Sequence, residues 1–162
     1  MSQRPHRVRT WSKRGQTPIL QHQFNWDNLS IAAGITQWQF YFRLYEGSMG
    51  KEEIRDFVQH LWKQIHKPML LIWDRLPGHR SRVLSDYVGT LDGAVEIHYL
   101  PAYAPELNPA EYIWAQLKQH ELANFCPKNL WHLSQEARSA LRSMQRRRTI
   151  VTACWKQASL FE

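Results

Sequence analysis

The stretch Met69-Leu-Leu-Ile-Trp-Asp74 runs through five apolar residues and ends on a carboxylate. An apolar run without a polar face is typical of a strand that is covered on both faces. The apolar residues that follow it at helical spacing are Val83, Leu84, Tyr87, Val88 and Leu91. Residues 94–100 then have the Val and Ile character of another strand. Strand, helix and strand in this order predict two parallel strands joined by a right-handed crossover.

Two further strands are expected upstream of this unit, at residues 29–36 and 38–45. The first is small and apolar, and the second alternates Trp38, Phe40, Phe42 and Leu44 with more polar residues. Alternation with a period of two predicts a strand with one buried face. The short gap between the two segments favours an antiparallel pair.

Helical spacing begins at Lys51 and continues to Ile65, with Glu52 and Glu53 in the first turn and Pro68 after the last. Acidic residues suit the start of a helix, and proline cannot continue one. A further helix is expected from Pro109 to about Leu122, and one or two more in the C-terminal third. The order β, β, α, β, α, β, α predicts a single α/β domain over residues 1–162, a mixed sheet with helices on its faces.

Composition limits the function classes. The 162 residues are 43% hydrophobic with eight Trp, which is enough apolar material for a core. Lys and Arg number 21 against 14 Asp and Glu, so the formal charge is 21 − 14, or +7. A basic balance favours a polyanionic partner such as nucleic acid, although many basic proteins bind none.

The two cysteines, Cys126 and Cys154, lie outside any Cys-x-x-Cys spacing, so the sequence indicates neither a disulfide framework nor a zinc ribbon. No run of about 18 apolar residues is present, and the Arg-rich N-terminus precedes no apolar segment. We therefore expect a reducing, cytoplasmic setting without a membrane span.

Two carboxylates stand at element ends, with 36 residues between them. Asp74 ends the buried strand, where open α/β sheets gather functional groups, but it also suits a cap of the following turn. Glu111 is the third residue of a helix that Asn108 and Pro109 begin, so a capping box is its structural alternative. Together the two acids suit one hard divalent cation such as Mg²⁺, completed by water and phosphate oxygens.

Basic and aromatic residues are candidates for contact with DNA. Lys118 follows Glu111 by almost two helical turns and would share its face. The others are His79, Arg80, Arg9, Trp11 and Arg14, with the basic run Arg146, Arg147 and Arg148. A solvated helix end explains His79 and Arg80 equally well, and a Trp that covers a sheet edge is a common structural use.

The residues from Leu71 to His79, followed by Leu100-Pro-Ala-Tyr-Ala-Pro-Glu-Leu-Asn-Pro-Ala-Glu111 with Trp114 and Lys118, resemble the catalytic domain of DDE-type transposases. The specific likeness is to the bacterial insertion-sequence branch of the mariner superfamily. Residues 9–18 and 122–127 resemble that branch too. The resemblance implies an RNase H-like fold, two Mg²⁺ or Mn²⁺ ions, DNA strand cleavage and transfer, and at least a dimer on DNA. Asp74 would be the second acid of the triad and Glu111 the third.

In that family the first acid lies on the central opening strand, shortly before the segment that residues 8–11 match. We therefore expect this chain to lack that strand, along with the preceding helix-turn-helix region. Loss of a central strand exposes strand edges and apolar surface, so the chain alone is expected to be unstable and inactive. Alternatively, the N-terminal part is encoded in another frame and joined by frameshifting. Two other functions remain open: another RNase H-like nuclease, such as a resolvase, or a non-catalytic DNA-binding remnant.

Overall fold

The computed structural model describes residues 1–21 and 27–158. Strands β1 (Leu29–Ile35) and β2 (Phe40–Glu46) form an antiparallel hairpin in which Ile35 lies opposite Phe40. This confirms the predicted pair. The expectation that Trp38 belongs to the apolar strand face was wrong, because Trp38 lies in the turn before β2 and is 71% exposed.

The predicted strand–helix–strand unit is also present. Strand β3 (Met69–Trp73) leads through a short helix, η1 (Pro77–Arg80), into helix α2 (Arg82–Gly89) and strand β4 (Val95–Tyr99). β3 and β4 are parallel, with Met69 opposite Val95 and Trp73 opposite Tyr99. The expected α/β architecture with strands of mixed direction and flanking helices is therefore confirmed.

Helix α1 (Lys51–Ile65) joins the two strand pairs. It begins where the Glu53 carboxylate accepts a hydrogen bond of 2.9 Å from the Gly50 N–H. Its buried Ile54 and Val58 pack with residues of α2, β3 and β4, whereas Phe57 and Leu61 pack against Ala32 of β1. The apolar stripe of α1 that the sequence shows thus packs against both strand pairs.

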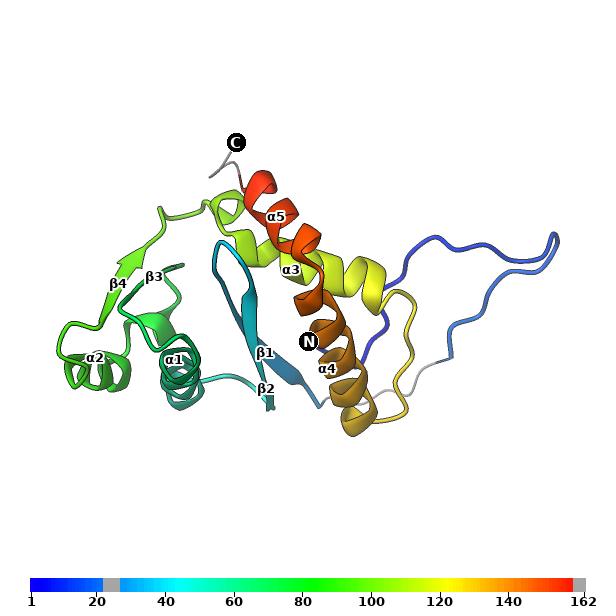
Figure 1. The fold of residues 1–162 in the computed structure, drawn as a ribbon. Helices are drawn as coiled ribbons and strands as arrows, with labels where there is room; N and C mark the ends of the chain where they lie inside the picture. The colour runs from blue at the N-terminus through cyan, green and yellow to red at the C-terminus, as the bar shows by residue number, and fades with distance from the viewer. Residues whose placement is uncertain (22–26, 159–162) are drawn as a thin grey trace.

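The opposite face of the hairpin is covered by the C-terminal helices (Figure 1). These are α3 (Pro109–Gln116), which continues into a π-helical turn η3 (Leu117–Glu121), then α4 (Leu130–Arg146) and α5 (Arg148–Gln157). A short helix, η2 (Pro105–Leu107), precedes α3. The fully buried side chains of this core include Leu29, Phe40, Ile113, Leu117, Leu141, Met144 and Val151. No helix in the described part of the chain is both long and apolar enough to cross a membrane.

The four strands found in residues 1–21 and 27–158 form two separate two-stranded sheets. The expectation that β3 is covered on both faces was wrong, since Leu70 and Ile72 are 56% and 55% exposed. Met69, Leu71 and Trp73 alternate with them along the strand and face the helices. Within residues 1–21 and 27–158, nothing packs over the second face of β3 in the way that α1 and α2 pack over the first.

Backbone hydrogen bonds show which strand edges are open. Met69 N–H bonds to Ala94 O (2.9 Å), and Leu100 N–H bonds to Trp73 O (2.8 Å). The backbone N–H and C=O groups of the odd-numbered residues of β3 therefore point toward β4. The backbone of Leu70 and Ile72 therefore points to the other edge. On β1 the outer edge pairs only at its start, where Leu29 exchanges hydrogen bonds with Met1. Over the described residues, β1 and β3 thus each keep one unpaired edge.

Candidate functional site

Asp74 and Glu111 line the same cleft, which has a volume of about 420 Å³. The walls are the loop after β3, the loop after β4 and the start of α3. The lining residues used below are Asp74, Arg75, Leu100, Tyr103, Asn108 and Glu111. The structure therefore brings together two acids that are remote in sequence, Asp74 directly after β3 and Glu111 in the first turn of α3, in a cleft beyond the carboxyl ends of the parallel strands.

Asp74 is held through one of its two carboxylate oxygens. Its Oδ1 accepts a hydrogen bond of 3.0 Å from the Leu76 N–H, and His79 Nδ1 lies 2.7 Å from the same oxygen. The capping role that the sequence suggested for Asp74 is thus realised. Oδ2 has no partner among the described residues, and the side chain is 44% exposed. One oxygen is fixed while the other stays available to a ligand.

Glu111 is not engaged in the capping box that was its structural alternative. The Asn108 side chain caps α3 by accepting from Ala110 N–H (3.1 Å), as expected. The Asn108 N–H itself bonds to Pro105 O (3.0 Å), so it does not bond the Glu111 carboxylate. Glu111 is exposed, and no hydrogen bond or ion pair occupies its carboxylate in the part of the chain that the structure describes.

His79 is mostly buried beside Asp74 and is not one of the residues that line the cleft. Its ring stacks on the indole of Trp73, with centroids 4.1 Å apart and planes 4° from parallel. Only 13% of the side chain is exposed. The sequence indicated His79 as a candidate DNA contact and did not predict this stack. The pattern that could have indicated it is Trp73-Asp74 followed by a histidine five residues after Asp74.

Two hydrogen bonds connect the segment after β3 with the end of β4 beside the cleft. Arg75 Nε–H donates to Leu100 O (3.2 Å), and Tyr99 Oη–H donates to the backbone oxygen of His79 (3.2 Å). Tyr103, at the rim, is fully exposed and has a left-handed backbone with φ of 58°. Both hydrogen bonds therefore tie the segment after β3 to the end of β4.

Lys118 lies away from the acids. It lines a second cleft of about 320 Å³ with the N-terminal residues 1–6. Seven residues along a helix is a rise of about 10 Å, and Lys118 also falls in the π-helical turn η3, where the straight-helix register that was assumed no longer holds. The structure therefore does not place Lys118 beside Glu111.

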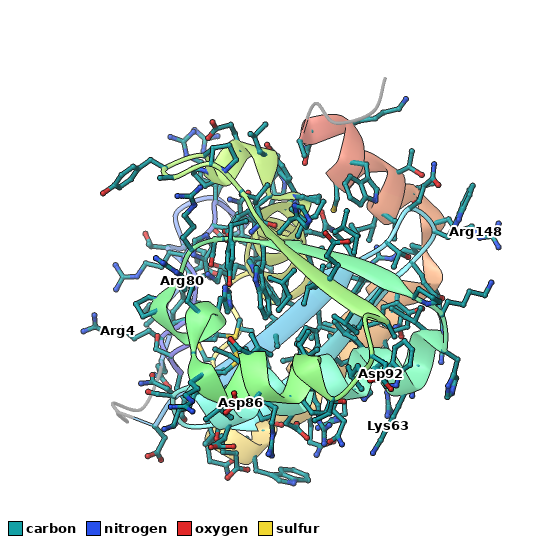
Figure 2. The ribbon with its side chains drawn as sticks, turned by 90° about the vertical axis from the view of Figure 1, so that its left-hand side faces the viewer. Arg4, Lys63, Arg80, Asp86, Asp92 and Arg148 are labelled. Carbon is teal, nitrogen blue, oxygen red and sulfur yellow. The ribbon has the colours of Figure 1, made fainter. Side chains whose placement is uncertain are left out.

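The other basic candidates lie on two surfaces. Arg80 ends η1, is exposed, and lies at the margin of the molecule in Figure 2. Arg9, Trp11 and Arg14 belong to an exposed arm that projects from the side opposite β3 and β4 (Figure 1). The base of the arm is fastened by Asn124, whose side chain bonds to Val8 N–H (2.9 Å) and Val8 O (3.0 Å).

Arg147 has a structural partner. It pairs with Glu121 and stands at the break between α4 and α5, so the basic run is a helix junction.

The donor set at the cleft suits a hard cation. Carboxylate oxygens are the protein ligands that Mg²⁺ prefers, and it keeps several waters when they are few. Over residues 1–21 and 27–158, no three His, Cys, Asp or Glu side chains are grouped to hold a metal ion. The described residues thus supply two carboxylates, and water or substrate oxygens would complete the coordination.

Known proteins share this fold. Two Mos1 mariner complexes match it: a strand transfer complex (TM-score 0.63, 18% identity) and a paired-end complex with Mn (TM-score 0.67, 16% identity). The matches cover 98% and 96% of this chain, and 52% and 48% of the Mos1 chains. The Mos1 transposase catalytic domain with raltegravir and Mg matches with a TM-score of 0.63 and 15% identity over 82% of this chain and 73% of that one.

The protein spans about half the length of the Mos1 chains in the first two complexes and has the RNase H-like fold of their catalytic domain. No curated protein sequence matches it. The family described as DDE superfamily endonuclease matches residues 1–134, which is most of the chain and includes both acids of the cleft. The chain therefore belongs to the DDE superfamily endonuclease family.

Proposed function

We propose that this chain is the catalytic domain of a bacterial insertion-sequence transposase that cleaves and joins DNA strands with divalent cations. The observation that carries the proposal is the shared cleft of Asp74 and Glu111. The family match, the Mn and Mg named for the Mos1 structures and the charge of +7 support it.

Asp74 Oδ2 and the Glu111 carboxylate would hold the cations, because both lack a partner within the described chain. Bound Mg²⁺ or Mn²⁺ would supply activation of a water or 3′-hydroxyl and stabilisation of the leaving oxygen. Arg75 and Arg80 would neutralise backbone phosphates next to the cleft.

We propose further that an extended segment carrying the first acid of the triad pairs between β1 and β3. The unpaired edges of these strands support this, because a strand inserted between them would pair with both edges. In the family that Asp74 and Glu111 match, the first acid stands on such a strand. The upstream reading frame, joined by frameshifting, is the source we propose.

Contact with DNA is proposed to extend over the exposed arm and η1, through Arg9, Trp11, Arg14 and Arg80, with Lys118 on a separate surface. Transposition brings two DNA ends together, so we propose a dimer on DNA. A reducing, cytoplasmic setting suits the two free cysteines.

Plasmid nicking with Mg²⁺ or Mn²⁺ tests the activity. We expect the chain, joined to the segment encoded upstream, to nick DNA, and Asp74→Ala or Glu111→Ala to abolish nicking. Asp86→Ala on α2 (Figure 2) and Glu106→Ala in η2 are matched controls, since both carboxylates are exposed and outside the cleft. Wild-type nicking by the Asp74 and Glu111 variants would refute the assignment.

A second candidate, a DNA-binding remnant without turnover, is favoured by the two-carboxylate donor set. It predicts DNA binding but no metal-dependent nicking even with the upstream segment present.

The proposed strand addition predicts that this segment raises the melting temperature. An equally high, cooperative melt of the chain alone would rule the strand addition out.

A further inference from the structure

The ring of His79 is held in one orientation by its surroundings. It stacks on Trp73 at 4.1 Å with planes 4° apart, and 87% of the side chain is removed from solvent, since 13% is exposed. Its backbone oxygen accepts a hydrogen bond from Tyr99 of β4. The last residues of the two parallel strands thus hold His79: Trp73 fixes the ring, and Tyr99 fixes the backbone.

Gly78 explains how the ring reaches this position. A Cβ at Gly78 would come within 2.5 Å of Ile54 Cδ1 on α1. The missing side chain lets η1 approach α1 closely, and this close approach sets the next residue, His79, against Trp73. The placement depends on the packing of α1 and is not a local property of the loop.

The ring nitrogen that faces Asp74 determines what His79 does. Nδ1 lies 2.7 Å from Asp74 Oδ1 and 3.3 Å from the backbone oxygen of Asp74. Both neighbours are acceptors, so Nδ1 carries the hydrogen and donates. With the Leu76 N–H as second donor, Oδ1 has two hydrogen bonds, and the carboxylate plane is set.

We propose that His79 is a positioning residue for metal binding, and that it acts by orienting the Asp74 carboxylate so that Oδ2 faces the cation. The inference rests on the proposed metal site. Hydrogen bonds to ligating carboxylates commonly change metal affinity by about 10–100-fold. A ring locked by Trp73 would also keep His79 from contacting DNA.

Mn²⁺ affinity of the purified chain, measured by electron paramagnetic resonance without DNA, tests this. We expect His79→Ala to weaken Mn²⁺ binding by about tenfold or more. His79→Asn places an amide N–H near the position of Nδ1 and should restore most of the affinity. DNA affinity without metal should be unchanged in both variants, and circular dichroism reports whether each is folded.

Four results count against the inference. If His79→Ala leaves Mn²⁺ affinity intact while Asp74→Ala removes it, the metal site stands and only the role of His79 fails. If His79→Ala weakens metal-free DNA binding instead, His79 is a DNA contact. If Asp74→Ala itself binds Mn²⁺ like the wild type, the proposed metal site is rejected and the inference falls with it. A folded His79→Asn protein as weak as His79→Ala also counts against the hydrogen bond.

Discussion

Replacing Gly78 by Ala tests the contact between η1 and α1. The new methyl would lie 2.5 Å from Ile54 Cδ1, whereas carbon atoms in contact are normally about 3.5–4.0 Å apart. Ile54 is 5% exposed, so it has little room to move. Overpacking of this kind costs about 1–3 kcal/mol, and the lower entropy of the unfolded Ala chain offsets about 0.4–1 kcal/mol. We expect Gly78→Ala to lower the free energy of unfolding by about 1–2 kcal/mol.

Ile54→Val separates this contact from other effects, because it removes the Cδ1 atom and leaves Cγ1 at 4.0 Å, an ordinary contact distance. As a single substitution, Ile54→Val should lower the free energy of unfolding by about 0.5–1.5 kcal/mol. Combined with Gly78→Ala, it should give a smaller total loss than the sum of the two single losses. Gly89→Ala is the matched control, since nothing lies within 4 Å of a Cβ there, and it should be neutral or stabilise by up to about 1 kcal/mol.

Urea unfolding followed by far-UV circular dichroism supplies the four free energies of this cycle. The slope of each transition shows whether the variants unfold in the same way. If the double variant loses the sum of the single losses to within about 0.5 kcal/mol, the close contact between Gly78 and Ile54 is refuted.

Two further predictions concern the C-terminal half. Burial raises the pKa of the Cys154 thiol from 9.0 to about 11, so its contribution to stability is present below pH 9.0 and is lost as pH rises toward 11. Cys154→Ala should show a shallower alkaline loss in thermal melts, and an unchanged slope would contradict the assignment. Asn124 has a φ of 56° and ties down Val8 through two hydrogen bonds, so Asn124→Ala should destabilise more than Asn124→Gly, by about 1 kcal/mol. Equal melting temperatures would show that the left-handed backbone at residue 124 is not strained.

Local pattern accounts for most of the secondary structure. The stripe of Ile54, Val58 and Leu61 predicted α1 because burial of a helix face imposes its own spacing on the sequence. Asn108 and Pro109 placed the start of α3 because capping is a short-range requirement. The parallel pairing of β3 and β4 followed from the long helical connection between them, because a crossover of this length joins parallel strands.

Pattern was misleading where the environment of an element is set by distant residues. Leu70 and Ile72 are as apolar as Leu71, so the sequence does not show that they face solvent while Leu71 faces α1. The shared face expected for Glu111 and Lys118 assumed a regular helix, whereas Lys118 lies in the π-helical turn η3, beside Leu117, which is buried in the core.

By itself, the sequence determined which segments become helices and strands and which two carboxylates stand at their ends, because those properties depend on neighbours a few residues away. Only the tertiary structure decided that Asp74 and Glu111 share one cleft, and that His79 is stacked on Trp73 beside Asp74 rather than exposed. Such contacts join residues that are far apart along the chain or depend on the packing of α1 against η1, and side-chain spacing carries no record of them.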